Sequence, residues 1–245
     1  MKPLPKSRPD TSPLLAFGAH PDDIEFGCGA IIALETRIGR KAHLVVCSRG
    51  EAATNGTPQE RTTEARKAAK LLGATLEFIE LDGDARLEVK PAHAIRLAAA
   101  IRKIRPGIIL APSLVENQHP DHACLGRLVR DASRLARYGG ITELRKLPPH
   151  AIGQLFYYAL TPEAEPRDIT PLWVDVSAPE VVRAWTDSMK AHASQARTRN
   201  YVEMQLVRAK ALGARAGISY AMALYPNDPM VIGELGHVSR AARRF

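Results

Sequence analysis

The chain has 245 residues, with 34 Lys and Arg against 26 Asp and Glu, so its formal net charge at pH 7 is +8. Hydrophobic residues make up 45% of the chain and charged residues 24%, which excludes disordered, collagen-like and fibrous proteins. Its apolar runs, such as 14–19 and 107–111, are far shorter than the roughly 20 residues of a membrane-spanning helix. We therefore expect a soluble protein with one domain over residues 1–245 and a flexible N-terminus over 1–12.

The N-terminal residues do not form a signal peptide, because four prolines precede their short apolar run and a His-Pro-Asp-Asp cluster ends it. A cytoplasmic location is the default expectation. The cysteines, Cys28, Cys47 and Cys124, form no CxxC pair, which argues against a disulfide framework and against a thiolate zinc site. We predict that all three are reduced and pack in the interior.

Strands and helices alternate along the first half of the chain. Short apolar runs predict buried strands over 13–18, 42–47, 75–81 and 107–111. Helical periodicity predicts helices over 28–38, 58–72, 91–105 and 122–136. Such units are joined by right-handed crossovers, which place the strands in a parallel sheet with helices on both faces. The pattern predicts a Rossmann-like, doubly wound α/β fold with a mostly parallel sheet.

The second half of the chain is less regular. It predicts strands over 154–160 and 172–176, followed by long helices over 179–192 and 199–214. No internal repeat and no Gly- or Ser-rich linker divides the chain. We interpret this half as a C-terminal α/β elaboration of the same domain.

Two polar clusters follow predicted strands. Ala19-His20-Pro21-Asp22-Asp23 comes directly after the strand over 13–18, and His119-Pro120-Asp121-His122 follows the strand over 107–111 after a short loop. The carboxyl ends of parallel strands meet at one edge of the sheet, where doubly wound proteins bind their ligands. The two clusters are therefore expected to converge.

Two His-Pro-Asp tripeptides in equivalent positions suit one divalent metal, held by His20, Asp23 and His122. Zinc fits best, because a catalytic zinc takes about three protein ligands from His and carboxylate and leaves a position open for water. Two His and one carboxylate also describe a site for Fe²⁺, which is the chemical competitor. That iron site usually lies on an all-β scaffold, unlike the one predicted here.

The neighbours of these ligands suit acid–base chemistry. If Asp23 binds the metal, the adjacent Asp22 points elsewhere and is placed to act as the general base. His119 lies three residues before His122 and is placed to protonate a leaving group or stabilise an oxyanion. Asp121 is placed to fix the tautomer of His119.

The same residues also have simpler structural interpretations. Asp22 or Asp23 is a suitable N-cap for the helix that follows, and Gly27 and Gly29 are explained by close packing, since the third glycine of a dinucleotide fingerprint is missing. The basic charge also suits a nucleic-acid-binding module. Aromatic residues are only 5% of the chain and the basic residues are dispersed, so we expect no nucleic-acid partner.

The sequence resembles the PIG-L (LmbE-like) family of zinc-dependent N-acetylglucosamine deacetylases, whose two signature motifs are similar to AHPDDIEFGCGA and HPDH. Two further segments extend the resemblance, toward the bacillithiol-pathway branch: SRGEAATNGTPQERTTEARKAAKLLGA and RNYVEMQLVRAKALGARAGISYA. The resemblance implies zinc on His20, Asp23 and His122, Asp22 as the base, His119 as the catalytic histidine and Asp121 as its support. It also implies a homo-oligomer, trimeric or hexameric. From the short apolar runs we expect no membrane partner.

Three further residues are candidates for substrate binding. Arg61 resembles a sugar-contacting arginine of the family, and Tyr201 resembles a tyrosine proposed to help the oxyanion. Each has an equally good structural explanation. Arg61 is placed to pair with Glu64 on the same helix, and Tyr201 suits a position in the core. Arg49 follows the second strand, and its guanidinium group is placed to form a bidentate contact with the carboxylates of a malate group. The alternative is that Arg49 is a loop residue with no contact to substrate.

The resemblance implies hydrolysis of the N-acetyl group of N-acetylglucosaminyl malate. A mycothiol precursor, a chitooligosaccharide and an antibiotic precursor are alternative substrates within the same family. The sequence departs from the family at Ala30, where glycine is common, and at Asn117-Gln118, where the bacillithiol branch often has an acidic-basic pair. The second departure flanks the expected substrate mouth, so it bears on the group attached to the sugar and leaves the predicted metal ligands intact.

Overall fold

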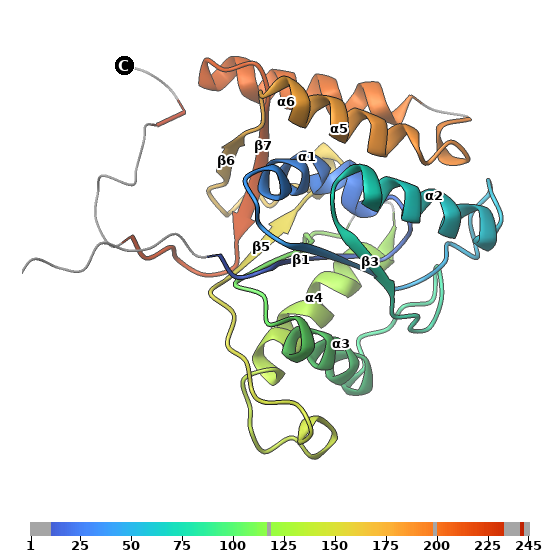
Figure 1. Ribbon diagram of the computed structural model, residues 1–245, viewed down its shortest axis with the longest axis vertical. Coiled ribbons are helices and arrows are strands. Elements are labelled where there is room, and N and C mark those ends of the chain that lie inside the picture. The colour runs from blue at the N-terminus through green and yellow to red at the C-terminus, as the bar shows by residue number, and fades with distance from the viewer. Residues whose placement is uncertain (1–10, 117–118, 198–199, 233–240, 243–245) are drawn as a thin grey trace, which may run out of the picture.

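The computed structural model describes residues 11–116, 119–197, 200–232 and 241–242. Its sheet has seven strands in the order β3-β2-β1-β4-β5-β7-β6, with helices on both faces (Figure 1). The strands are β1 (Leu14–Gly18), β2 (Ala42–Val46), β3 (Thr75–Phe78), β4 (Ile108–Pro112), β5 (Gln154–Tyr158), β6 (Leu172–Asp175) and β7 (Ala221–Pro226). The helices are α1 (Asp23–Arg37), α2 (Pro58–Leu71), α3 (Pro91–Ile104), α4 (Pro120–Leu135), α5 (Pro179–Lys190) and α6 (Tyr201–Ala216), with short 3-10 turns at Thr142–Leu144, Pro162–Ala164 and Gln195–Arg197.

The sheet is mixed, with most of its strands parallel. Strands β3, β2, β1, β4 and β5 run parallel, whereas β7 pairs antiparallel with both β5 and β6. The predicted α/β fold with a mostly parallel sheet is confirmed. Strand β7 was not among the predicted elements, although its sequence AMALYP is a short apolar run bounded by proline.

Alternate residues of β1 pack into two separate cores. Leu14 and Ala16 lie in a cluster with α1, α2, α5 and α6, while Leu15 and Phe17 pack with α3 and α4. Figure 1 shows these two helical layers on opposite faces of the sheet. Strand β1 is therefore buried on both faces, as its continuous apolar sequence predicts.

Helix α1 begins earlier than its periodicity predicts, at Asp23 instead of residue 28. Cys28 has non-helical backbone angles, φ −147° and ψ 15°, so regular periodicity starts only after this kink. Gly27 lies against Tyr158, because a Cβ at Gly27 would be 2.2 Å from the tyrosine ring. This confirms the packing interpretation of Gly27, and the contact brings the first turn of α1 close to β5.

The three cysteines are buried and carry free thiols, as predicted. In the part of the chain that the structure describes, every helix is too short or too polar to cross a membrane. The predicted flexible N-terminus over 1–12 lies outside the described residues except for Thr11 and Ser12, and so do Asn117 and Gln118.

Candidate metal site and its pocket

The two His-Pro-Asp clusters meet at one edge of the sheet. Strands β1 and β4 are adjacent and parallel, so the loops that follow them leave the sheet side by side. The ligand atoms of His20, Asp23 and His122 all lie within 4.8 Å of one another. The sequence-based expectation that the clusters converge is therefore confirmed.

Asp23 lies between the two histidines of this group. Its Oδ1 is 3.1 Å from Nε2 of His122, and its Oδ2 is 3.5 Å from Nδ1 of His20. The same Oδ2 accepts hydrogen bonds from the backbone N–H groups of Ala19, at 2.8 Å, and His20, at 2.9 Å. All three candidate ligands are buried, which holds their side chains in fixed positions.

The charges of this group favour a cation. Burial alone raises the pKa of Asp23, but His122 and His20 outweigh it and hold this pKa well below its usual range. Burial lowers the pKa of His20, but Asp23, Asp121 and Asp84 outweigh it and raise this pKa well above its usual value. Nδ1 of His122 is buried without a hydrogen-bond partner in the described part of the chain. Two imidazoles and an ionised carboxylate in this arrangement fit a divalent metal.

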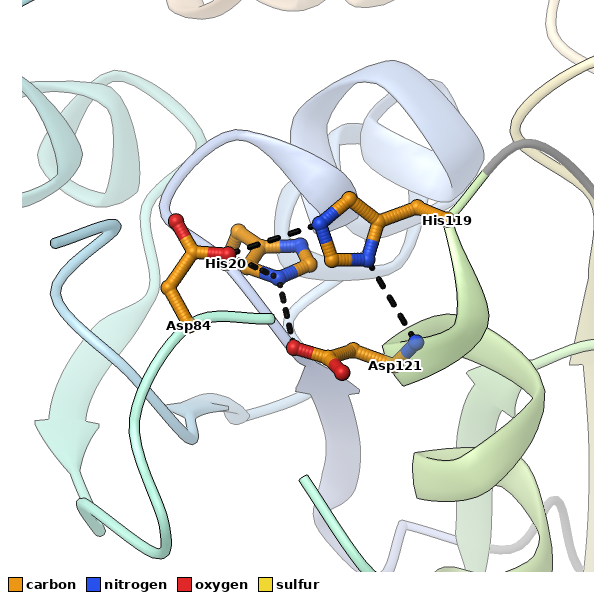
Figure 2. Close-up of side chains that lie close together, drawn as sticks. All are labelled: His20, Asp84, His119 and Asp121. Atoms are coloured by element: carbon orange, nitrogen blue, oxygen red, sulfur yellow. Dashed lines mark hydrogen bonds and ion pairs between the residues drawn. The ribbon is translucent and has the colours of Figure 1, made fainter. Parts of the chain in front are cut away.

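Asp121 supports the site through both its side chain and its backbone (Figure 2). Its Oδ2 lies 3.2 Å from Nε2 of His20 and accepts a 2.8 Å hydrogen bond from the backbone N–H of Ala85. Its backbone N–H donates to Nδ1 of His119 at 3.4 Å. A carboxylate on the second nitrogen of a metal-binding histidine fixes the ring orientation and raises its basicity. Asp121 thus contacts both predicted functional histidines.

Asp84 is a site residue that the sequence analysis missed. Its Oδ1 lies 3.1 Å from Nε2 of His20 and 3.4 Å from Nε2 of His119, and Figure 2 shows it bridging the two rings. Together, His20, Asp84, His119 and Asp121 form a second group able to hold a metal. The available signal was the acidic segment Leu81-Asp82-Gly83-Asp84, which follows β3 at the same edge of the sheet.

Asp22 lines the pocket in a strained backbone conformation. Its φ is 109° and its ψ −26°, a region that non-glycine residues rarely adopt and that is concentrated at functional sites. Asp22 occupies the N-cap position of α1, but its side chain makes no capping hydrogen bond, so the capping interpretation is wrong for this side chain. Burial raises the pKa of Asp22 to about 6, although the nearby Arg61 acts in the opposite direction.

Arg61 reaches the loop that carries Asp22. Its Nη2 donates to the carbonyl oxygen of Pro21 at 2.8 Å and lies 3.5 Å from Oδ2 of Asp22, while Nη1 is 4.0 Å from Asp84. Glu64, the alternative partner of Arg61, instead accepts hydrogen bonds from Ser194. Arg61 is 4% exposed, so it braces the loop as well as lining the pocket.

These residues surround a cavity of about 630 Å³. Its apolar side includes Phe26, which is 6.0 Å from Tyr201 between ring centroids in an edge-on arrangement. Tyr201 lines this cavity and also packs against the core, so its role at the oxyanion stays a prediction. Arg49 is not among the lining residues; it pairs with Glu80 at 2.8 Å and lies 5.0 Å from the centroid of the Phe78 ring. Its predicted contact with substrate carboxylates stays a prediction.

A family model described as PIG-L: GlcNAc-PI de-N-acetylase matches residues 15–133, which include both clusters and Asp84. This segment of the chain matches the PIG-L family. It is 29% identical over 180 residues to a 4-oxalmesaconate hydratase of Pseudomonas putida, covering 65% of this chain and 68% of that protein. It is 28% identical over 203 residues to a diacetylchitobiose deacetylase of Thermococcus kodakarensis, covering 76% and 71%.

A solved structure shares the fold of the chain. The crystal structure of a conserved protein from Thermus thermophilus superposes with a TM-score of 0.79 at 29% identity, covering 93% of this chain and 99% of that one. The likeness to that structure therefore extends beyond residues 15–133 and includes most of the second half of the chain.

Proposed function

We propose that this protein is a zinc-dependent hydrolase that removes the N-acetyl group from an N-acetylglucosaminyl conjugate. The observation that supports the proposal is the convergence of His20, Asp23 and His122, with Asp22 and His119 lining the same cavity. A metal group beside an independent base and a proton donor is the arrangement that amide hydrolysis by water requires. The similarity to a diacetylchitobiose deacetylase supports the same reaction.

His20, Asp23 and His122 would hold the metal. When bound, zinc supplies Lewis-acid chemistry: it polarises a carbonyl oxygen and lowers the pKa of a coordinated water. Fe²⁺ accepts the same set of ligands, so metal analysis decides between the two. The carboxylate of Asp121 on the far nitrogen of His20 supports either metal by fixing the ring.

The remaining steps are proton transfers by residues of this chain. Asp22 takes a proton from the attacking water, whose oxygen forms a bond to the acetamide carbonyl carbon. His119 accepts a backbone hydrogen bond at Nδ1, so its neutral ring carries the proton on Nε2, facing Asp84. The proton on Asp22 then passes to the nitrogen of the leaving amine as the C–N bond breaks, while the Nε2–H of His119 donates a hydrogen bond to the developing oxyanion. The products are acetate and a free glucosaminide.

The group attached to the sugar is a separate question. The resemblance to the bacillithiol branch implies malate, and the net charge of +8 favours anionic conjugates in general. N-acetylglucosaminyl malate is therefore the first substrate that we would test. A mycothiol precursor, a chitooligosaccharide and an antibiotic precursor complete the panel.

The test measures amine release from each conjugate by the purified chain, after chelation and after restoration of zinc or Fe²⁺. Free N-acetylglucosamine serves as the control for the attached group. Release that depends on metal and is faster for the malate conjugate supports the whole proposal. Equal release from all conjugates keeps the deacetylase and contradicts the malate preference, whereas no release from any of them contradicts the deacetylase.

A hydratase is the second candidate function. It is favoured by the similarity to 4-oxalmesaconate hydratase, which matches this chain at nearly the same identity as the deacetylase does. Hydration also needs water and acid–base groups, which Asp22 and His119 supply equally well. The loss of ultraviolet absorbance from a conjugated unsaturated dicarboxylate, measured with the same metal-loaded protein, distinguishes the two reactions.

A further inference from the structure

Gln195 lines the catalytic cavity from the segment between α5 and α6. It belongs neither to the metal group nor to the acid–base pair, and the sequence motifs do not include it. Its neighbours form an ordered chain of hydrogen bonds that begins at Glu64 on α2. These hydrogen bonds determine which polar atom of the Gln195 amide is left for a ligand.

Glu64 determines which atom donates and which accepts in each of these hydrogen bonds. Its Oε1 accepts from the backbone N–H of Ser194 at 2.8 Å, and its Oε2 lies 2.6 Å from the Ser194 hydroxyl. A carboxylate only accepts hydrogen bonds, so the single hydroxyl proton of Ser194 is donated to Glu64. The Ser194 oxygen can then only accept from its other neighbour.

That neighbour is the side-chain amide of Gln195. Its Nε2 lies 3.0 Å from Oγ of Ser194 and 2.8 Å from the backbone carbonyl oxygen of Asn55. Both partners are acceptors, so both amide protons are used and the amide has only one orientation. Oε1 is the polar atom that remains for the cavity, and it is an acceptor.

The local backbone maintains this arrangement. Gly56 has φ +77°, and a Cβ there would lie 2.8 Å from the Ser194 side chain, so the loop before α2 and the segment after α5 are in close contact. The backbone N–H of Gln195 donates to the carbonyl oxygen of His192 at 3.1 Å. The amide is thus fixed before any ligand arrives, which reduces the entropy lost on binding.

From this geometry we infer that Gln195 is a specificity-determining residue, whose Oε1 accepts a hydrogen bond from one hydroxyl group of the substrate sugar. The inference rests on the proposed function, because it assumes a hydroxyl-bearing substrate in this cavity. A pre-oriented acceptor discriminates against an analogue without the donor, since the acceptor is then left unpaired.

The test combines a variant with altered substrates. The conjugate that the wild-type chain deacetylates fastest is compared with its 3-, 4- and 6-deoxy sugar analogues, using the wild-type chain, Gln195→Leu and Gln59→Leu. Gln59 is an exposed residue outside the cavity, so Gln59→Leu is the matched control. For Gln195→Leu, KM for the parent conjugate should rise about 3- to 10-fold with little change in kcat, which is the usual cost of one neutral hydrogen bond.

The decisive result is coupling between variant and substrate. One deoxy analogue should be turned over with the same kcat/KM by Gln195→Leu and by the wild-type chain, because its hydroxyl is already missing. If Gln195→Leu lowers kcat/KM by the same factor for the parent conjugate and for all three analogues, the inference is overturned. A uniform loss caused by misfolding counts as this result. No amine release by the wild-type chain from any conjugate overturns the proposed function and the inference with it, so the two failures are distinguishable.

Discussion

Asp22 and Asp23 are adjacent carboxylates with opposite properties. Burial raises the pKa of Asp22 to about 6, whereas the pKa of Asp23 is held well below its usual range by His122 and His20, against the effect of its own burial. The left-handed backbone angle of Asp22 turns its side chain toward Arg61 and the cavity, while Asp23 begins the helix and faces the histidines. One peptide unit thus separates the proposed base from the proposed metal ligand.

This separation predicts different effects for two variants. Asp22→Asn should keep the metal and lose about 10²- to 10⁴-fold in kcat, the usual contribution of a general base. Asparagine tolerates the left-handed backbone at this position, so the fold should be preserved. His122→Ala should lose both metal and activity. Metal content and amine release, measured on the same preparations, check the pair, and equal metal loss in both variants would contradict the assignment.

The cysteines should be chemically inert in the folded protein. Burial raises the pKa of Cys124 to about 11 and holds the pKa values of Cys28 and Cys47 well above their usual range, so at pH 8 the three thiols are almost fully protonated. Only the thiolate reacts, so we expect no alkylation by iodoacetamide at pH 8 and three labelled cysteines in denaturant. Mass spectrometry of the two samples tests this. Rapid labelling of a cysteine in the native protein would show that the cysteine is exposed.

At the scale of elements, helix α2 connects separate parts of the pocket. Arg61 donates to the loop after β1 and to the carbonyl oxygen of Gly50, and Glu64, one turn later, accepts from Ser194 after α5. The start of the helix is itself fixed by a capping box between Thr57 and Glu60. Arg61 and Glu64 therefore position three loops relative to one another.

A glycine substitution tests this bracing. Gly50 has φ +73°, and a Cβ there would lie 1.8 Å from Nη1 of Arg61. Gly50→Ala should lower the free energy of unfolding by about 1–2 kcal/mol through backbone strain, and by about 1–3 kcal/mol more through displacement of Arg61. It should also lower kcat, because the loop of Asp22 loses its support.

The matched control is Gly217→Ala. Gly217 has φ +67° at the end of α6, but nothing lies within 4 Å of its Cβ position, so only the backbone strain should lower stability there. Urea unfolding and amine release are measured for both variants. Equal destabilisation and equal activity of the two would show that Arg61 does not brace the loop.

Sequence periodicity predicted most elements because they follow buried, regular patterns. The parallel strands β1, β2 and β4 and the helices α2 and α3 are of this kind. The start of α1 was missed because polar site residues occupy its first turn and Cys28 interrupts its periodicity. Strand β7 carries a short apolar run of its own, but its antiparallel place between β5 and β6 depends on long-range pairing that leaves no local signal.

The site was predictable where a motif brought several functional residues together. Both His-Pro-Asp clusters were found, and the topology of the parallel sheet predicted their convergence. Asp84 and Gln195 were missed, because each is a single residue on a loop whose position depends on long-range packing. The orientation of the Gln195 amide follows from a hydrogen-bonding chain that crosses 131 positions in sequence, from residue 64 to residue 195.

At the scale of the whole molecule, the metal should contribute to stability, because its predicted ligands come from loops after two different strands. Binding to the folded chain alone adds about 2.7 kcal/mol when the free metal is at 100 times Kd. For a chain of 245 residues this corresponds to a rise in Tm of about 5–10 °C. Calorimetry after chelation and after zinc restoration tests the expectation. An unchanged Tm, with metal shown to bind, would contradict it.

The order of the strands has a consequence for synthesis of the chain. Strand β7 lies between β5 and β6, yet both of these precede it in sequence. While the chain is being made, β6 has no partner in the sheet and β5 keeps an open edge until residues 221–226 leave the ribosome. The nascent chain therefore presents an unpaired strand edge, which is a template for aggregation, during the synthesis of more than sixty residues after β5.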